Sequence, residues 1–141
     1  MENWRAKAME QFPELQKLIE EQSGIVAFWI ELYDALEAAY EEQPLNDKLI
    51  GKVYEYAAWC INQPQDQGAD VEDPSSAAAV GLIESIPLNK HIADDLYRWL
   101  SVETFEGCEA LFRYHLSEDE YRKFSDDFMR KKKQFAGTSR L

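Results

Sequence analysis

The chain has 141 residues, of which 45% are hydrophobic and 13% aromatic, and its formal net charge is −12 at pH 7. This composition predicts one packed globular domain and excludes a disordered chain. No uninterrupted apolar run approaches the roughly 18 residues of a membrane span, and the opening segment, MENWRAKAMEQF, lacks the apolar region of a signal peptide. We therefore expect a single helical domain over residues 1–136, in the cytoplasm, followed by a loose tail over residues 137–141.

The acidic charge is distributed unevenly along the chain. Residues 1–89 contain 17 acidic and 5 basic residues, whereas residues 90–141 contain 10 of each. A negative field of this kind disfavours nucleic acid and anionic lipid as partners and favours a basic protein. Charge that serves only solubility is the alternative explanation.

Three patterns of apolar residues predict helices in the first part of the chain. The first helix covers residues 3–11. Pro13 suits the first turn of a helix, so a second helix is expected from there to the neighbourhood of Gly24. The third covers residues 25–42 and follows the 3.6-residue period. Its expected core positions are Ile25, Phe28, Trp29, Leu32, Leu36 and Ala39.

Four acidic residues fall on the opposite face of the third predicted helix. None has a lysine or arginine four positions away, and like charges at this spacing cost roughly a few tenths of a kcal/mol each. Because the fold does not require such a row, it is the first candidate for a partner-binding surface, and a merely solvated face is the alternative. We call it the acidic row, and its members are Glu31, Asp34, Glu37 and Glu41.

Asn46 is expected to cap the next helix, which extends to Gln63. Glu55 and Trp59 fall on its polar side, together with Lys52. A tryptophan in such a position is either covered by another helix or part of a contact surface. Glu55 and Trp59 therefore join the acidic row as candidate partner-binding residues. The expected core positions are Leu49, Ile50, Val53, Tyr56, Ala57, Cys60 and Ile61.

A polar loop over residues 63–73 contains several acidic residues and invites comparison with a calcium site. An EF-hand loop that began at Asp66 would need an oxygen ligand at its third position and glycine at its sixth. Gly68 and Val71 occupy these positions. We therefore expect no metal in this loop.

Asp73 and Pro74 are expected to start the next helix, as N-cap and first residue. This helix, over residues 75–85, is rich in alanine, serine and glycine. Small side chains predict a close approach to another helix, with Trp59 as a candidate neighbour. Glu84, among apolar neighbours, is expected to be partly buried in a capping or ion-pair role, and a functional role is the alternative.

Residues 87–100 repeat the pattern of residues 44–57. Aligned at an offset of 43 residues, both segments begin Pro-Leu-Asn, and Tyr54 coincides with Tyr97. Asn89 is therefore expected to cap its helix as Asn46 does. Repeats of about 40–47 residues built from helix pairs are typical of HEAT and armadillo arrays. The predicted fold is all-α, with about seven helices in antiparallel pairs, in a compact bundle with HEAT/armadillo-like solenoid character.

Two further helices are expected at the end of the chain. Ser101 caps the first, over residues 102–116, and Ser117 with Glu120 forms a capping box for the second. The basic cluster, Arg130 to Lys133, falls in the last turn of this helix, where it complements the helix dipole. Pairing with the acidic N-terminal part of the chain is a second expected use, and nucleic-acid binding is the alternative.

No motif predicts catalytic chemistry. Phosphate-binding glycine motifs are absent, as are CxxC and HExxH. Cys108 and His115 would lie roughly 10 Å apart along a helix axis, too far for a nucleophile and its base. Cys60 and Cys108 are expected to be buried free thiols. We expect no enzyme, no catalytic residue, no cofactor and no metal site.

Three segments, YEYAAWC, SAAAVGLIES and LFRYHLSEDEY, resemble an uncharacterised bacterial all-helical family of unknown function. The resemblance covers residues 49–128 and consists of hydrophobic spacing with a few polar positions. It transfers no activity to any residue, but it implies a small bacterial interaction protein, with immunity proteins that neutralise a co-encoded toxin as one such class.

The leading hypothesis is an acidic protein-binding module that engages a basic partner. One alternative is a homo-oligomer, such as a homodimer, in which the basic-tipped C-terminal part of one subunit meets the acidic part of another. A second alternative is an enzyme or small-ligand-binding protein with a pocket near Trp59, Tyr56 and Glu84. Neither nucleic acid nor a membrane is expected as a partner.

Overall fold

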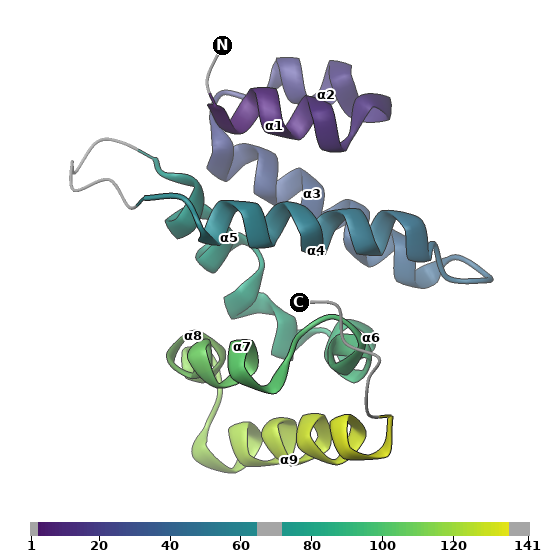
Figure 1. The fold of residues 1–141 in the computed structure, drawn as a ribbon, viewed down its shortest axis with the longest axis vertical. Helices are drawn as coiled ribbons and strands as arrows, with labels where there is room; N and C mark the ends of the chain where they lie inside the picture. The colour runs from purple at the N-terminus through teal and green to yellow at the C-terminus, as the bar shows by residue number, and fades with distance from the viewer. Residues whose placement is uncertain (1–2, 65–71, 136–141) are drawn as a thin grey trace. The chain divides into compact units, whose positions relative to one another are not determined.

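The computed structural model describes residues 3–64 and 72–135, and these residues form nine α-helices, three short 3-10 segments and no β-strand (Figure 1). The prediction of an all-α fold is therefore confirmed. Most of the polar loop, with Asp66, Gly68, Asp70 and Val71, and the expected tail over residues 137–141 lie outside the described residues.

The chain folds into two compact units, Met1–Leu82 and Ile83–Leu141. The single domain expected over residues 1–136 stays a prediction. The first unit contains α1 (Asn3–Gln11), η1 (Pro13–Leu15), α2 (Gln16–Glu21), α3 (Ile25–Glu41), α4 (Asp47–Ile61) and α5 (Pro74–Gly81). The second contains η2 (Ile83–Leu88), α6 (Lys90–Asp95), η3 (Leu96–Arg98), α7 (Val102–Gly107), α8 (Glu109–Arg113) and α9 (Glu118–Gln134).

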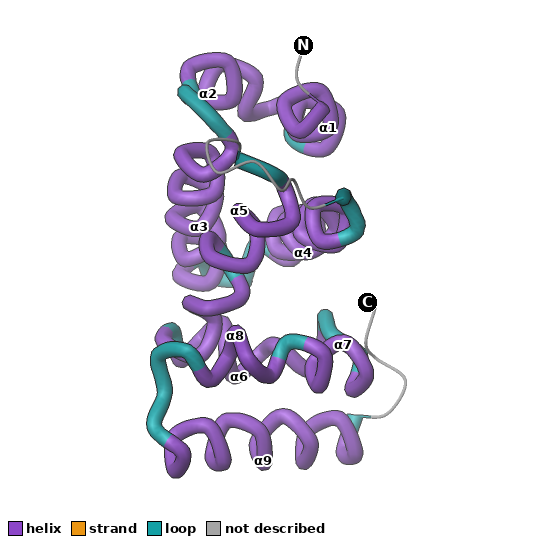
Figure 2. Tube along the Cα trace, turned by 90° about the vertical axis from the view of Figure 1, so that its left-hand side faces the viewer, coloured by secondary structure: helices purple, strands orange, loops and turns teal. Residues whose placement is uncertain are grey.

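In the first unit, α1 and α2 form one layer beside the longer helices α3 and α4, and α5 packs against both α3 and α4 (Figure 2). The layers meet in an aromatic core. Tyr56 of α4 contacts the rings of Phe12, Phe28 and Trp29 at centroid distances of 5.6–5.7 Å. Its hydroxyl donates a hydrogen bond of 3.1 Å to the Trp4 carbonyl oxygen, which satisfies the one polar group that this buried ring carries.

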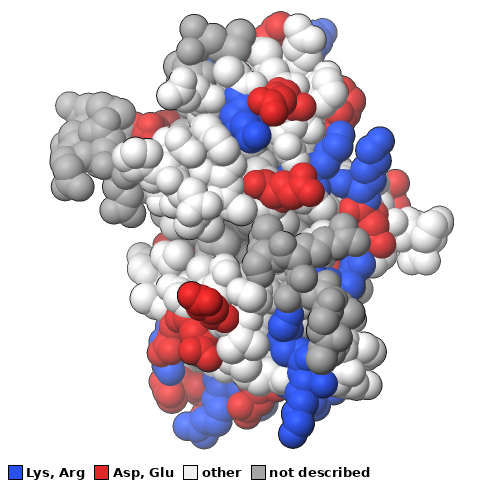
Figure 3. All heavy atoms as spheres, viewed as in Figure 1, with Lys and Arg blue, Asp and Glu red and all other residues white. Residues whose placement is uncertain are grey.

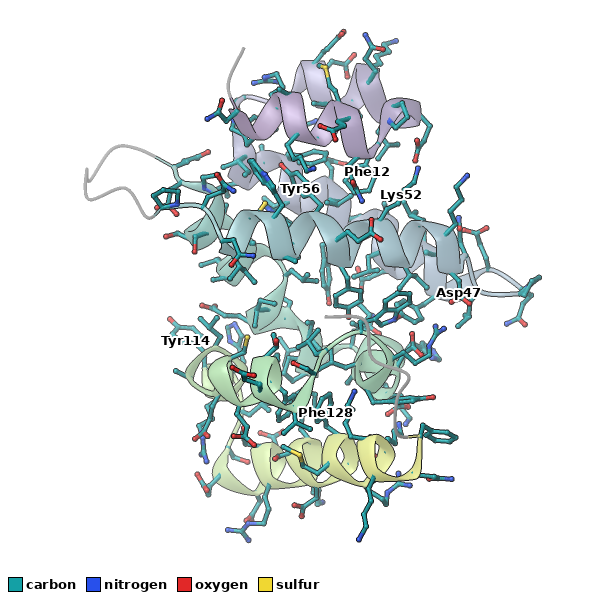
Figure 4. All side chains as sticks on the ribbon, viewed as in Figure 1. Phe12, Asp47, Lys52, Tyr56, Tyr114 and Phe128 are labelled. Atoms are coloured by element: carbon teal, nitrogen blue, oxygen red, sulfur yellow. The ribbon has the colours of Figure 1, made fainter. Side chains whose placement is uncertain are left out.

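In the second unit, the short helices α6, α7 and α8 lie on one side and α9 crosses beneath them (Figure 2). The core is again aromatic. Phe105 of α7 stacks on Phe128 of α9 with ring centroids 3.9 Å apart, and Phe112 of α8 lies 5.0 Å from Phe105. Figure 4 shows Phe128 pointing from α9 toward the layer that contains α7. This cluster joins α9 to two short helices that have little stability alone.

The expected helix starts are confirmed by side-chain caps. Asn46 and Asn89 accept hydrogen bonds from the N–H groups of Leu49 (3.2 Å) and Ile92 (3.1 Å). Asp73 caps α5 and Ser101 caps α7 in the same way. Ser117 and Glu120 form the complete capping box of α9. Each cap satisfies one of the N–H groups that a helix start leaves without a partner.

Three predicted helices are interrupted in the described residues, but only the division of the last of them adds an α-helix. The helix expected over residues 75–85 ends at Gly81 and continues as the 3-10 segment η2, which contains Pro87. The helix expected over residues 87–100 is α-helical only in α6 and then becomes η3. The helix expected over residues 102–116 divides at Cys108, whose N–H is shared among several carbonyls.

Three expectations about the core are corrected. Ile61, assigned to the apolar stripe of α4, is 40% exposed, because it lies at the last position of that helix. Leu49, also assigned to the apolar stripe of α4, is only half-buried, because it lies in the first turn of that helix. Cys108, expected to be buried like Cys60, is only half-buried. The small residues of α5 allow a close approach, and the neighbour at Gly81 is Trp29. A Cβ atom added to Gly81 would lie 2.6 Å from Cβ of Trp29.

Candidate functional site

The acidic row lies on α3, on the face opposite the buried residues of that helix. Glu31, Asp34 and Glu41 are exposed, and Glu37 is half-buried. All six core positions predicted for this helix are buried, from Ile25 to Ala39. The 3.6-residue period therefore places the row correctly, because one continuous helix of 17 residues carries both faces.

Two apolar side chains extend the same surface toward the start of α3. Val26 is 40% exposed and Ile30 is 58% exposed. They lie four residues apart, and Asp34 follows after four more, so the three side chains follow one another along the helix. Neither apolar residue was among the predicted site residues, although the same helical period places both outside the core.

The carboxylates of the row change the chemistry of a neighbouring phenol. The pKa of Tyr33 is raised to about 12, first because the ring is partly buried and then because Glu37 and Asp34 place negative charge beside it. Ionisation would add a further negative charge to this surface. Tyr33 therefore remains a neutral hydrogen-bond donor at physiological pH.

The start of α3 uses a carboxylate from a distant segment. Gly24, the N-cap residue, has no side chain that could accept a hydrogen bond. Instead, the N–H of Val26 donates a hydrogen bond of 3.3 Å to Oε1 of Glu72, just before α5. A negative charge at this end of a helix is favourable because of the helix dipole. Glu72 thus links the two helices and belongs to the fold, not to the acidic row.

Glu55 and Trp59 lie on α4, so the six predicted partner-binding residues divide between two helices. Oε2 of Glu55 accepts a hydrogen bond of 2.9 Å from Nε2 of Gln11, on the side of α4 that faces α1. Trp59 is half-buried, and its ring stacks on Tyr56 at a centroid distance of 5.9 Å. Trp59 is therefore anchored to the aromatic core and keeps only part of its ring available to a partner.

Cys60 is held as an unreactive thiol inside the first unit. Burial raises its pKa to about 12, although the polar groups of Trp29 and Tyr56 beside it favour the thiolate. Because the thiolate is the nucleophilic form, a thiol in this environment is a poor nucleophile. Burial also raises the pKa of Cys108 in the second unit.

Glu84, expected to be partly buried in an ion pair, belongs to the second unit. Its side chain is 14% exposed, and Oε1 lies 3.7 Å from Nε2 of His115, a pair that is ionic when the imidazole is protonated. Trp59 and Tyr56, proposed with Glu84 as the lining of one pocket, belong to the first unit.

The basic cluster is used within the second unit. Nζ of Lys131 donates a hydrogen bond of 2.7 Å to the carbonyl oxygen of Asp94 and lies 3.0 Å from Oδ2 of Asp127. Nζ of Lys132 donates to the carbonyl oxygen of Tyr97 at 3.2 Å. Two lysines of the basic cluster therefore bind carbonyl groups near the C-terminal ends of α6 and η3, in addition to complementing the dipole of α9. The sequence could not show these acceptors, which lie 35–37 residues away.

The comparisons with known proteins give no match: no family model, no curated protein and no solved structure matches the chain. In the described part of the chain, no helix has the length and apolar character needed to cross a membrane. Among the same residues, no three His, Cys, Asp or Glu side chains converge as a metal site would require.

Proposed function

We propose that the chain is a protein-binding module whose acidic first unit engages a basic partner protein. The observation that carries this proposal is the acidic row, because three of its four carboxylates are exposed on one continuous helix of 17 residues. Residues 1–82 contain 16 acidic and only 5 basic residues, so few internal cations are present to neutralise the row. A surface of this kind attracts a positively charged partner over about one Debye length.

Val26 and Ile30 favour a protein as the partner over a simple cation. Protein interfaces combine an apolar centre with a charged rim, and the exposed face of α3 offers both over a few turns. The partner surface that would complement it carries a small apolar patch next to several lysine or arginine side chains. The carboxylates would then contribute to the association rate and specificity, and the apolar contacts to residence time.

A bacterial immunity protein that neutralises a basic toxin in the cytoplasm is the class of module that we favour. The resemblance of residues 49–128 to an uncharacterised bacterial all-helical family agrees with this class, as does the small acidic first unit. The role requires no catalytic residue and no cofactor in this chain. A toxin gene next to the gene for this chain would be independent support.

A salt-dependent capture experiment tests the proposal. The tagged chain is used to capture proteins at about 50 mM and at about 500 mM salt. The electrostatic screening length falls severalfold between these two concentrations. We expect a basic protein at low salt and its loss at high salt. The variant E31Q/D34N/E37Q/E41Q should lose it, whereas the matched variant E20Q/E21Q/E103Q/E106Q, which neutralises four exposed carboxylates elsewhere, should retain it.

Three results would reject the proposal. They are the absence of any basic protein at low salt, capture that does not depend on salt, and equal loss in both variants. A dimer in light scattering that persists at working concentrations would instead favour the homo-oligomer alternative. Circular dichroism of both variants separates loss of binding from loss of fold.

We also infer that residues 44–57 and 87–100 are copies of one ancestral helix, as in a HEAT-like solenoid. The equivalent residues Asn46 and Asn89 cap their helices in the same way. The equivalent pairs Val53 with Leu96 and Tyr56 with Trp99 are buried. The copies differ in length, since α4 continues to Ile61 whereas α6 ends at Asp95. Homologous sequences in which both copies keep the Pro-Leu-Asn start would test the inference.

A further inference from the structure

A groove of about 390 Å³ opens in the first unit, between η1, α3 and the first turns of α4. Its volume falls within the range of roughly 300–1,000 Å³ that is usual for small-ligand pockets. Three half-buried apolar side chains form its floor, one from each element: Leu15, Ala35 and Leu49. The sequence predicted no pocket here, because these residues are far apart along the chain.

Two lysines line the same groove. Lys48 and Lys52 are the only basic residues in the long stretch from Leu18 to Asn89. They lie one turn apart on α4, and both reach the groove. The positive charge of this strongly acidic part of the chain is therefore concentrated beside an apolar floor, which is the arrangement that an amphipathic anion requires.

The two lysines differ in their ion pairing. Nζ of Lys52 lies 3.6 Å from Oε1 of Glu14, across the groove, and Figure 4 shows its side chain pointing from α4 toward the layer of α1 and α2. Lys48 is exposed, and within the described residues no ion pair holds its ammonium group. The lining therefore carries two positive charges against one negative charge. The nearby start of α4 adds the positive end of its dipole.

We propose that this groove binds a small amphipathic carboxylate. Lys48 provides the principal contact to the carboxylate, Lys52 provides a second one, and the apolar body of the ligand packs on Leu15, Ala35 and Leu49. A phosphate group fits less well, because the groove offers neither arginine nor a glycine-rich row of N–H groups. No residue of the acidic row lines the groove, and Ala35 lies on a different side of α3 from Val26 and Ile30.

The probe is octanoate, with octanol as the neutral control and octylamine as the cationic control. Binding is followed by amide chemical shifts in two-dimensional NMR spectra of the full chain. We expect saturable shifts that are confined to η1, the middle of α3 and the start of α4. Octanol should bind about tenfold more weakly than octanoate, and octylamine should not bind at this position.

Variants separate the charge contribution from the apolar one. K48Q should weaken octanoate binding about fivefold, since an exposed ion pair contributes modestly, and K48R should restore it. A35L should fill the groove and abolish binding. K17Q, which removes an exposed lysine outside the groove, should have no effect.

Equal binding of octanol and octanoate would overturn the proposal, because it would show apolar adhesion without recognition of charge. Unchanged affinity in K48Q, or shifts that lie outside the groove, would overturn it as well. The variant with the neutralised acidic row should bind octanoate at least as well as the parent, because no residue of the row lines the groove and the loss of negative charge nearby favours an anion. Failure of the capture experiment and failure of this one are therefore distinguishable.

Discussion

The two units differ in their balance of acidic and basic residues and in the contacts that these residues make. Residues 1–82 contain 16 acidic and 5 basic residues, whereas residues 83–141 contain 11 and 10. In the second unit, acidic and basic side chains lie side by side on the face that Figure 3 shows. Arg113, for example, pairs with Glu109 at 2.8 Å and with Glu118 at 2.5 Å. The second unit uses its charges to hold its own helices, and the first presents a net negative surface.

The same difference extends to the backbone. The first unit is built on two long helices, α3 and α4, whose buried faces are continuous. The second unit consists mainly of helices of five or six residues, followed by the long α9. Short helices need side chains from elsewhere to satisfy their ends, and Lys131 and Lys132 supply these contacts. Charged side chains that make contacts within the second unit are less available for contacts with a partner protein.

The largest expected effect is the loss of an aromatic ring from the second unit. F105A removes the ring that stacks on Phe128 at 3.9 Å and should lower the free energy of unfolding by about 3–5 kcal/mol. Hydrogen exchange measured residue by residue should increase in α7 and α9, and the amides of α3 and α4 should keep their protection. Equal loss of protection in both units would show that they unfold together, and the contrast between them would not extend to stability.

Two glycine-to-alanine substitutions, one in each unit, should change the free energy of unfolding by a smaller amount and in different directions. G81A places a methyl group 2.6 Å from Cβ of Trp29 and should destabilise the first unit by about 1–3 kcal/mol. G107A is the matched control, since no described atom beyond the neighbouring backbone lies within 4 Å of the added Cβ. It should be neutral or stabilise the second unit by up to about 1 kcal/mol. Urea unfolding of both variants measures the difference, and a G81A variant as stable as the parent would contradict the packing of α5.

The smallest expected effect comes from removing a lysine whose contacts lie within the second unit. K131M removes the hydrogen bond to Asp94 and the ion pair with Asp127, and should destabilise the second unit by about 1 kcal/mol. K133M, at an exposed position of the same helix turn, should change stability by less than about 0.5 kcal/mol. Thermal unfolding at low and high salt measures both. If the two variants behave alike, the basic cluster acts only on the helix dipole.

Local features of the sequence determined where most helices begin. Asn46, Asp73, Asn89, Ser101 and Ser117 cap helices as expected, because an N-cap needs only the next three residues of its own chain. The apolar period also placed the acidic row on the outer face of α3, since a continuous helix carries its faces along its whole length.

Only the tertiary structure decided where helices end and what lies beside them. The end of α5 at Gly81 accompanies its close approach to Trp29, a residue 52 positions earlier. The acceptors of Lys131 and Lys132 lie on other helices, and the groove near Lys48 takes its walls from three segments. Caps and periods are properties of one stretch of chain, whereas these contacts exist only after distant stretches have packed together.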